Sequence, residues 1–334
     1  MKSDNWFSLK YSDGEVVFLD QTKLPAVEDY VHTQSYLRIA EAIKRLEIRG
    51  APLIGIAAAY ALALSVKQGY SQQLFNDSYL TLASTRPTAV NLFNCLNRMR
   101  DFCENLPENK RNFENLILEA IAIHKEDEQA CEAIAENGKK IFNSKSRVLT
   151  HCNTGKLATG GIGTAFGVIL RGFEAGLVEM VFADETRPLF QGLRLTSYEL
   201  SKSNIPFKVI PDSAAGVLIR DGKVDLVITG ADRIASNGDS ANKLGTFSLS
   251  VLCKTSGIPF YIAAPSSTID FKAGGFEDIP IEERSSDELI QYLDPDLGFK
   301  NIDSFNPSFD VTPAENISGI ITEKGFYTYP YNFS

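Results

Sequence analysis

Two side chains in the second half of the chain have the chemistry and the sequence context that proton transfer needs. Cys152 stands between a short apolar run and a glycine-bearing turn, a setting that favours the thiolate form. Asp232 follows the apolar run 224–229, where partial removal from water suits a carboxyl group to acid–base work near neutral pH. An ordinary buried cysteine, and an aspartate that caps a helix or pairs with Arg233, remain the alternatives. His151 adjoins Cys152, but neighbours in a strand point to opposite faces, so a nucleophilic Cys–His pair is not expected.

Three further segments are typical of phosphate binding. The segment Arg49-Gly50-Ala51 stands at the start of an apolar helix, and Arg86 precedes another predicted helix. The N–H groups and the dipole of a helix N-terminus favour an anion, and arginine adds a bidentate donor. The pair Asn242-Lys243 follows a turn and supplies an amide and a cation. Each segment alone is more often a solvated surface charge, but together they favour a phosphorylated ligand.

Five apolar, strand-like runs must position these groups. The runs cover 147–150, 178–183, 207–210, 224–229 and 259–263, and polar clusters follow them at His151, Asp184, Pro211, Gly230 and Ala264. Alternation of strand, turn and helix predicts βαβ units and a parallel sheet. Parallel sheets bind ligands at the carboxyl ends of their strands, so we expect the clusters to border one crevice.

The N-terminal part of the chain has a different pattern. Apolar runs at 6–11 and 16–19 flank Ser12-Asp13-Gly14-Glu15, which predicts a β-hairpin. Apolar spacings of three and four then predict helices from Ser35, from Pro52, over 88–103 and over 113–142. We therefore expect an α/β protein with an N-terminal mostly helical domain, carrying a small β element, over 1–143. The parallel sheet with its flanking helices occupies 144–334, with a late strand at 317–322 after a helix-start pattern at 312–315.

Composition limits the classes of function. The chain has 334 residues, 44% of them hydrophobic, enough to bury a core in about two domains. Its net charge of −9 argues against a nucleic-acid partner. Five cysteines without a C-x-x-C pair argue against a disulfide framework and a structural zinc site. The longest apolar run, 53–66, is too short to span a bilayer, and no secretory leader is visible, so we expect a cytoplasmic protein without a membrane partner.

Glycines at 155, 160, 161, 163 and 167 imitate a dinucleotide-binding fingerprint. They follow a predicted strand and precede a helix, and Asp184 ends the next strand. The gap between Gly163 and Gly167 is one residue too long, however, and Leu157 stands where a P-loop has Ser or Thr. Tight packing of a helix on the sheet is the favoured explanation. A dinucleotide-dependent oxidoreductase is the minority alternative.

A series of strings between about residues 45 and 325 resembles the methylthioribose-1-phosphate isomerase family. The strings lie at 49–52, 86–92, 150–153, 184–188, 191–192, 194–196, 230–235, 237–239, 241–243, 281–284, 309–313 and 321–325. Chance does not produce so many strings in one order.

The resemblance implies a mostly helical N-terminal domain, a Rossmann-like C-terminal domain and a homodimer. It implies an aldose–ketose isomerase that converts 5-methylthio-D-ribose 1-phosphate to 5-methylthio-D-ribulose 1-phosphate in methionine salvage, with no cofactor and no metal. Carried over by motif, Cys152 and Asp232 are the catalytic pair. The residues that contact the phosphorylated sugar are then Arg49, Gly50, Ala51, Arg86, Gln191, Asn242 and Lys243.

Several positions depart from the usual pattern of the family, namely Phe93-Asn94-Cys95, Thr154, Lys156, Gly160-Gly161-Ile162 and the segment 211–215. They leave open the group at the 5-position of the sugar, so 5-deoxyribose 1-phosphate and ribose 1,5-bisphosphate are alternative substrates. The same fold resembles regulatory subunits of the translation-initiation exchange factor, which bind sugar phosphates or nucleotides without catalysis. The presence of both Cys152 and Asp232 favours an enzyme.

Overall fold

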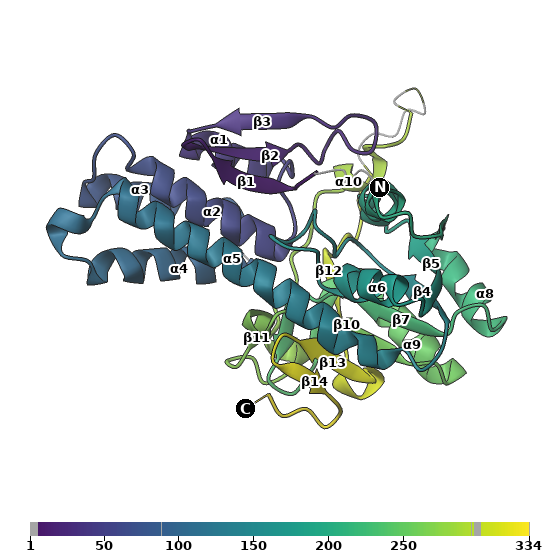
Figure 1. Cartoon of the computed structure of the whole chain (residues 1–334). Helices are drawn as coiled ribbons and strands as arrows, with labels where there is room; N and C mark the ends of the chain where they lie inside the picture. The colour runs from purple at the N-terminus through teal and green to yellow at the C-terminus, as the bar shows by residue number, and fades with distance from the viewer. Residues whose placement is uncertain (1–5, 88, 295, 297–301, 334) are drawn as a thin grey trace. The chain divides into compact units, whose positions relative to one another are not determined.

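The computed structural model describes residues 6–87, 89–294, 296 and 302–333, and the chain forms two compact units (Figure 1). Unit 1 comprises residues 1–133 and 154–167, and unit 2 comprises residues 134–153 and 168–334. The chain therefore passes between the units after residues 133, 153 and 167. The single domain boundary predicted at residues 143–144 stays a prediction.

Unit 1 begins with a small antiparallel sheet of order β1-β2-β3. Its strands are β1 (Leu9–Ser12), β2 (Glu15–Leu19) and β3 (Tyr30–Thr33). Asp13 and Gly14 both have positive φ, 55° and 81°, which is the geometry of a two-residue hairpin turn. The predicted hairpin is confirmed, with a first strand that begins at Leu9.

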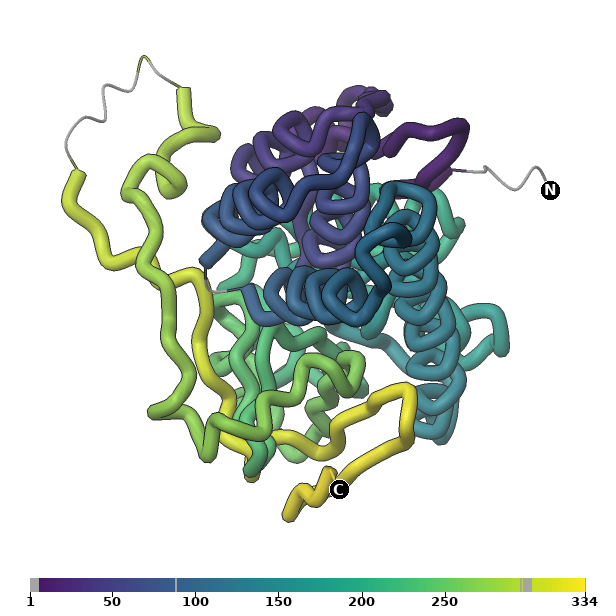
Figure 2. Tube along the Cα trace, turned by 90° about the vertical axis from the view of Figure 1, so that its left-hand side faces the viewer, coloured from purple at the N-terminus to yellow at the C-terminus, as the bar shows by residue number. Residues whose placement is uncertain are grey.

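A helical layer follows the small sheet. Its helices are α1 (Tyr36–Lys44), α2 (Ala51–Ser65), α3 (Gln72–Ala83), α4 (Val90–Asn105) and α5 (Phe113–Gly138). Every residue of α2 from Leu53 to Leu64 is buried, as expected for a helix that is apolar on all sides. Figures 1 and 2 show α2, α4 and α5 running alongside one another, and their buried side chains share one core. The predicted helix over 88–103 corresponds to α4, and Thr88 itself lies outside the described residues.

Unit 2 is built on a seven-stranded sheet of order β14-β13-β10-β7-β4-β5-β6. Its strands are β4 (Ser146–Thr150), β5 (Val178–Asp184), β6 (Phe207–Ile210), β7 (Leu226–Thr229), β10 (Phe260–Ala263), β13 (Gly319–Thr322) and β14 (Gly325–Tyr327). Neighbours from β13 to β6 pair in parallel, and β14 adds an antiparallel edge. The predicted parallel sheet is confirmed, because all five predicted runs are neighbouring strands.

Helices and a second sheet surround this parallel sheet. The helices are α6 (Ala165–Glu174), whose first residues belong to unit 1, α7 (Ser197–Lys202), α8 (Ala215–Arg220), α9 (Thr246–Ser256) and α10 (Asp287–Ile290). The second sheet has the order β11-β8-β9-β12, with β8 (Arg233–Ala235), β9 (Ser240–Lys243), β11 (Ile269–Asp270) and β12 (Phe309–Thr312). The helix start predicted at 312–315 is only a single 3₁₀ turn, Ala314–Asn316.

The α/β fold class predicted from the sequence is thus confirmed. Among the residues that the structure describes, no helix has both the length and the apolar character that a membrane crossing needs.

Candidate active site

Two neighbouring strands carry Cys152 and Asp232 to the same edge of the unit 2 sheet. Strands β4 and β7 pair in parallel, with Leu149 opposite Val227, and the Thr150 hydroxyl donates to the Ile228 carbonyl at 2.8 Å. Cys152 follows the end of β4 by two residues, and Asp232 follows the end of β7 by three. The sheet therefore delivers a thiol and a carboxyl group at adjacent carboxyl ends, the position at which parallel sheets bind ligands.

Cys152 has an unusual backbone conformation. Its φ of 63° lies in the left-handed region, which β-carbon sterics disfavour, and the residue is only 9% exposed. The N–H of Cys152 donates to Oγ1 of Thr186 at 2.9 Å, and its carbonyl accepts from Oγ1 of Thr196 at 2.5 Å. Residues held in such conformations cluster at active sites, where the surroundings determine them.

Asp232 lies at the entrance of the second sheet. Its N–H donates to the Ala241 carbonyl of β9 at 2.9 Å, and the residue is half-buried. Arg233, which the sequence offered as an ion-pair partner for Asp232, forms an ion pair with Asp270 at 3.7 Å.

The other predicted binding residues of unit 2 lie on elements that border the same edge. Asn242 and Lys243 end β9, and the Lys243 ammonium donates to the Ser308 carbonyl at 2.8 Å. Asn242 is buried, and its amide donates to Oγ1 of Thr246 at 2.9 Å. Gln191 is only 5% exposed, and within the described part of the chain its Oε1 accepts no hydrogen bond. A buried acceptor of this kind favours a ligand that brings a donor, such as a sugar hydroxyl.

His151 forms a buried ion pair that the sequence reasoning missed. Its Nδ1 lies 2.8 Å from Oδ2 of Asp184, and its Nε2 lies 2.9 Å from the Leu244 carbonyl. Both ring nitrogens thus face oxygen atoms, an arrangement that suits a doubly protonated imidazolium beside an ionised Asp184. Burial alone would lower the pKa of His151, but the hydrogen bond to Asp184 and the charges of Asp184 and Asp212 outweigh it and raise the pKa. The sequence signal for this pair was that two predicted strands end just before residues 151 and 184. Because Thr150 pairs with Ala183 in the structure, residues 151 and 184 lie opposite each other.

By distance, His151, Asp184 and Asp212 form a cluster that could hold a metal ion. Their hydrogen bonds argue against it, because both nitrogens of His151 are already engaged. Asp212 accepts from the N–H groups of Thr186 and Arg187 at 2.7 and 2.8 Å. The cluster therefore serves to hold the loops after β4, β5 and β6 together.

The remaining predicted residues belong to unit 1. Gly50 is the N-cap of α2 with a φ of 91°, and a β-carbon there would lie 2.4 Å from the Ala158 Cα, so only glycine fits. Arg49 and Ala51 flank it at the start of the helix, as predicted. Arg86 is half-buried four residues before α4. The structure thus confirms the helix starts, and the contacts of these residues with a phosphate stay predictions.

The chain is similar over most of its length to proteins of known family. Residues 47–329 match the model of the Initiation factor 2 subunit family. The chain is 48% identical to a methylthioribose-1-phosphate isomerase of Desulfitobacterium hafniense, over 97% of this chain and 96% of the relative. It is also 48% identical to a protein of the same name from Caldicellulosiruptor saccharolyticus, over 96% of both chains. The chain belongs to the methylthioribose-1-phosphate isomerases of this family.

Solved structures of the family have the same fold. A 5-methylthioribose 1-phosphate isomerase from Pyrococcus horikoshii superposes with a TM-score of 0.88 at 36% identity, over 99% of this chain and 97% of that one. A protein from A. fulgidus described as translation initiation factor eIF-2B, subunit delta, gives a TM-score of 0.84 at 38% identity, over 98% and 97% of the two chains. The resemblance drawn from the sequence strings is therefore confirmed.

The glycine-rich segment after Cys152 serves packing. Gly155 and Gly163 form an isolated bridge, and β-carbons at Gly160 and Gly161 would collide with His124 and with Cys131 of α5. The sequence predicted that these glycines pack a helix on the parallel sheet, whereas Gly160 and Gly161 pack on helix α5 and Gly155 and Gly163 pack against each other within the loop. A loop of residues 151–164 separates β4 from α6, whereas a dinucleotide fingerprint needs a tight strand-to-helix turn.

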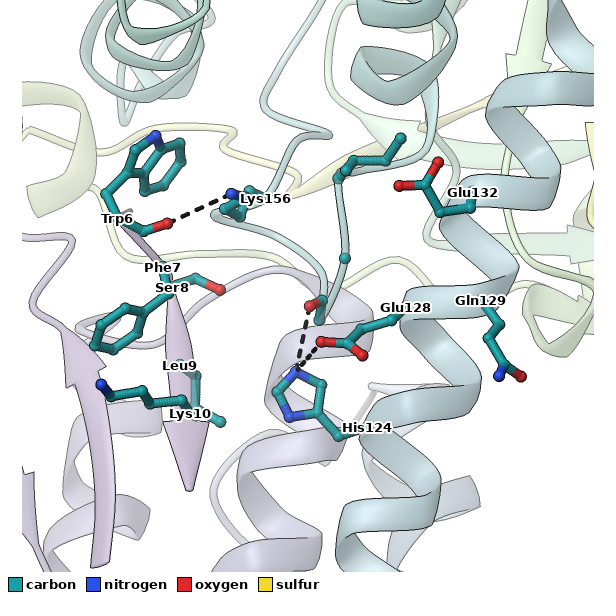
Figure 3. Close-up of a pocket in the computed structure, with 13 residues that line it drawn as sticks. Trp6, Phe7, Ser8, Leu9, Lys10, His124, Glu128, Gln129, Glu132 and Lys156 are labelled. Carbon is teal, nitrogen blue, oxygen red and sulfur yellow. Dashed lines mark hydrogen bonds and ion pairs between the residues drawn. The ribbon is translucent and has the colours of Figure 1, made fainter. Parts of the chain in front are cut away.

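Unit 1 also contains a cavity of about 740 Å³ between its N-terminal segment, α5 and the loop 156–162. Figure 3 shows Lys156 reaching the main-chain oxygen of Trp6, at 3.4 Å, and His124 close to Glu128. A second cavity of about 630 Å³ lies in unit 2 beside Asp239, Phe247 and Tyr331. Neither set of described lining residues includes a predicted site residue.

Proposed function

We propose that this chain is an aldose–ketose isomerase that converts 5-methylthio-D-ribose 1-phosphate to 5-methylthio-D-ribulose 1-phosphate in methionine salvage. The observation that carries this proposal is the near full-length identity of 46–48% to relatives named methylthioribose-1-phosphate isomerase. The adjacent strand ends that carry Cys152 and Asp232 supply side chains suited to the reaction.

The reaction requires proton transfer at two places. A sugar phosphorylated at C1 does not open freely to an aldehyde, so the bond between C1 and the ring oxygen must break on the enzyme. One hydrogen then moves from C2 to C1, the C2 hydroxyl gives up its proton to become the ketone, and the former ring oxygen takes up a proton to become a hydroxyl. We assign the giving and taking of protons to Asp232, and assistance of the transfer to Cys152.

The substrate contacts belong to the same proposal. Gln191, Asn242 and Lys243 offer a buried amide oxygen, an amide and an ammonium on elements that border the edge of the unit 2 sheet. Arg49, Gly50, Ala51 and Arg86 stand at or before helix starts, which suits them to an anion. The homodimer implied by the resemblance and the cytoplasmic location expected from the sequence also belong to this proposal, and light scattering of the purified protein tests the dimer.

A second candidate function is sugar-phosphate or nucleotide binding in a regulatory assembly. The structural likeness to the A. fulgidus protein favours it, because the identity of 38% is as high as that to the Pyrococcus horikoshii isomerase. A binding subunit has no use for the thiol and the carboxyl group at positions 152 and 232, so the enzyme remains the better proposal.

The test is turnover of defined sugars. Purified protein is incubated without added cofactor with 5-methylthioribose 1-phosphate, 5-deoxyribose 1-phosphate or ribose 1,5-bisphosphate, and the anomeric phosphate signal is followed by phosphorus NMR. Loss of that signal with the methylthio sugar, faster than with the other two, is the expected result. Faster turnover of another sugar reassigns the substrate, and binding without turnover of any sugar supports the regulatory subunit.

A further inference from the structure

The left-handed backbone of Cys152 needs an explanation that packing alone does not give. A cysteine at φ 63° has its β-carbon in a disfavoured position, yet the residue is buried at the carboxyl edge of the sheet. Such a conformation persists only where the surrounding structure imposes it. The N–H and the carbonyl of Cys152 are both bound by threonine hydroxyls, at 2.9 Å to Thr186 and at 2.5 Å to Thr196.

Thr196 reaches Cys152 from an irregular helical turn. It is the last residue of the π-helical turn Gly192–Thr196, which runs into α7. Thr196 is only 2% exposed, and its one hydroxyl proton is donated to the Cys152 carbonyl. Turns of this type are frequent at functional sites, because the extra residue redirects a side chain.

Thr186 links Cys152 to the loops after β5 and β6. Its hydroxyl accepts from the Cys152 N–H and donates to the Asp184 carbonyl at 3.1 Å. Thr186 is itself left-handed, with a φ of 61°, and its N–H donates to Oδ1 of Asp212 at 2.7 Å. One chain of hydrogen bonds therefore runs from Asp212 through Thr186 to Cys152.

We propose that Thr186 and Thr196 are positioning residues that hold Cys152 in the one backbone conformation from which its thiol serves the reaction. This inference rests on the proposed function. The two hydroxyls come from separate elements and bind opposite ends of one residue, so they fix the direction of its Cα–Cβ bond. Each hydroxyl is buried and has its proton committed, and neither threonine is proposed to touch the sugar.

The test compares isosteric and conservative variants in the full chain. Thr196→Val and Thr186→Val remove the hydroxyl and keep the shape, and Thr196→Ser and Thr186→Ser keep the hydroxyl. We expect the valine variants to lose roughly 10- to 100-fold in kcat with KM changed by less than about threefold, and the serine variants to recover most of the loss. Thermal unfolding of each variant gives the folded fraction to which kcat is referred.

A second readout does not depend on the sugar. The rate at which iodoacetamide modifies Cys152, followed by mass spectrometry of its peptide, should differ from that of the parent by at least about threefold in both valine variants and return in both serine variants. Unchanged kcat of the folded protein together with an unchanged alkylation rate overturns the proposal. A parent protein that turns over none of the three sugars refutes the proposed function instead, and the alkylation rates then decide alone whether the hydroxyls position the thiol.

Discussion

The two units of this protein differ in where they bury polar groups. In unit 1, residues 53–64 of helix α2 are buried in the apolar core, and the glycine-rich loop makes close contacts that leave no room for a β-carbon. In unit 2, the carboxyl edge of the sheet buries an imidazole, carboxylates and hydroxyls within one network of hydrogen bonds. Burying such groups costs free energy unless every partner is present. Their concentration at one edge therefore marks the region that chemistry, and not folding alone, has shaped.

Two buried histidines show the same difference within one residue type. In unit 1, Nδ1 of His124 lies 3.0 Å from the Tyr60 hydroxyl and Nε2 lies 3.2 Å from the Gly160 carbonyl, contacts that a neutral ring satisfies. Burial lowers the pKa of His124. In unit 2, the hydrogen bond to Asp184 and its charge raise the pKa of His151 in spite of its burial. The first histidine fills a core, and the second holds together the loops around Cys152.

Asp232→Asn should have the largest effect on activity. The amide keeps the size of the side chain but neither accepts nor donates a proton in the reaction, so kcat should fall by about 10³-fold or more while KM stays within a few-fold. Steady-state kinetics by phosphorus NMR measures both. Asp225→Asn is the matched control, because Asp225 precedes the same strand at its opposite end and pairs with Arg147. Equal loss of kcat in both variants would contradict the assignment.

Cys152→Ala should reduce kcat by about 10²-fold, since it removes the group that assists the transfer. Cys253→Ala provides the comparison with a packing cysteine of the same unit, which is fully buried on α9 and whose pKa is raised to about 12 by burial. The control should lose thermal stability and keep its turnover. Turnover of Cys152→Ala within a few-fold of the parent would make Cys152 a packing residue as well.

Arg86→Ala tests whether unit 1 contributes binding. Loss of a charge-assisted hydrogen bond to phosphate should raise KM by roughly 10- to 100-fold with little effect on the melting temperature. Arg100→Ala on α4 is the control, because the Arg100 guanidinium lies over the Tyr79 ring. An unaltered KM in Arg86→Ala would remove this residue from the phosphate site.

Gly163→Ala should lower the free energy of unfolding, and it tests how tightly the glycine-rich loop of unit 1 is packed. Its φ is 100°, and a β-carbon would lie 2.5 Å from the Gly155 Cα, so we expect the free energy of unfolding to fall by about 2–4 kcal/mol. Gly176→Ala, with a φ of 73° and open space around the new carbon, should cost only about 1 kcal/mol. Urea unfolding of the two variants measures the difference, and equal costs would show that the loop is not tightly packed.

The sequence predicted the helices and strands more accurately than the long-range contacts that position the candidate site residues. Asp13-Gly14 predicted the hairpin and the five apolar runs predicted the parallel strands, because both signals lie within short stretches of sequence. The pairing of β12 with β9 brings together residues such as Asp310 and Asn242. Because these residues lie far apart along the chain, no local sequence pattern predicts that they pair.

The sequence offered candidate site residues by type, and it carried no signal for their conformation. The left-handed backbone of Cys152 follows from hydroxyls that arrive from residues 186 and 196, and the π-helical turn that carries Thr196 has no period that the sequence reveals. His151 was set aside as a partner of Cys152, and in the structure its ring pairs with Asp184.

Cys152 and Asp232 are proposed to act on one bound sugar. The most direct measurement is a crystal structure of the Asp232→Asn variant, which should bind but not convert 5-methylthioribose 1-phosphate, grown with that sugar. We predict that the Cys152 sulfur and the side chain at position 232 both lie within about 3.5 Å of the reacting atoms at C1 and C2. A well-ordered sugar with either group turned away from those two carbons would contradict it.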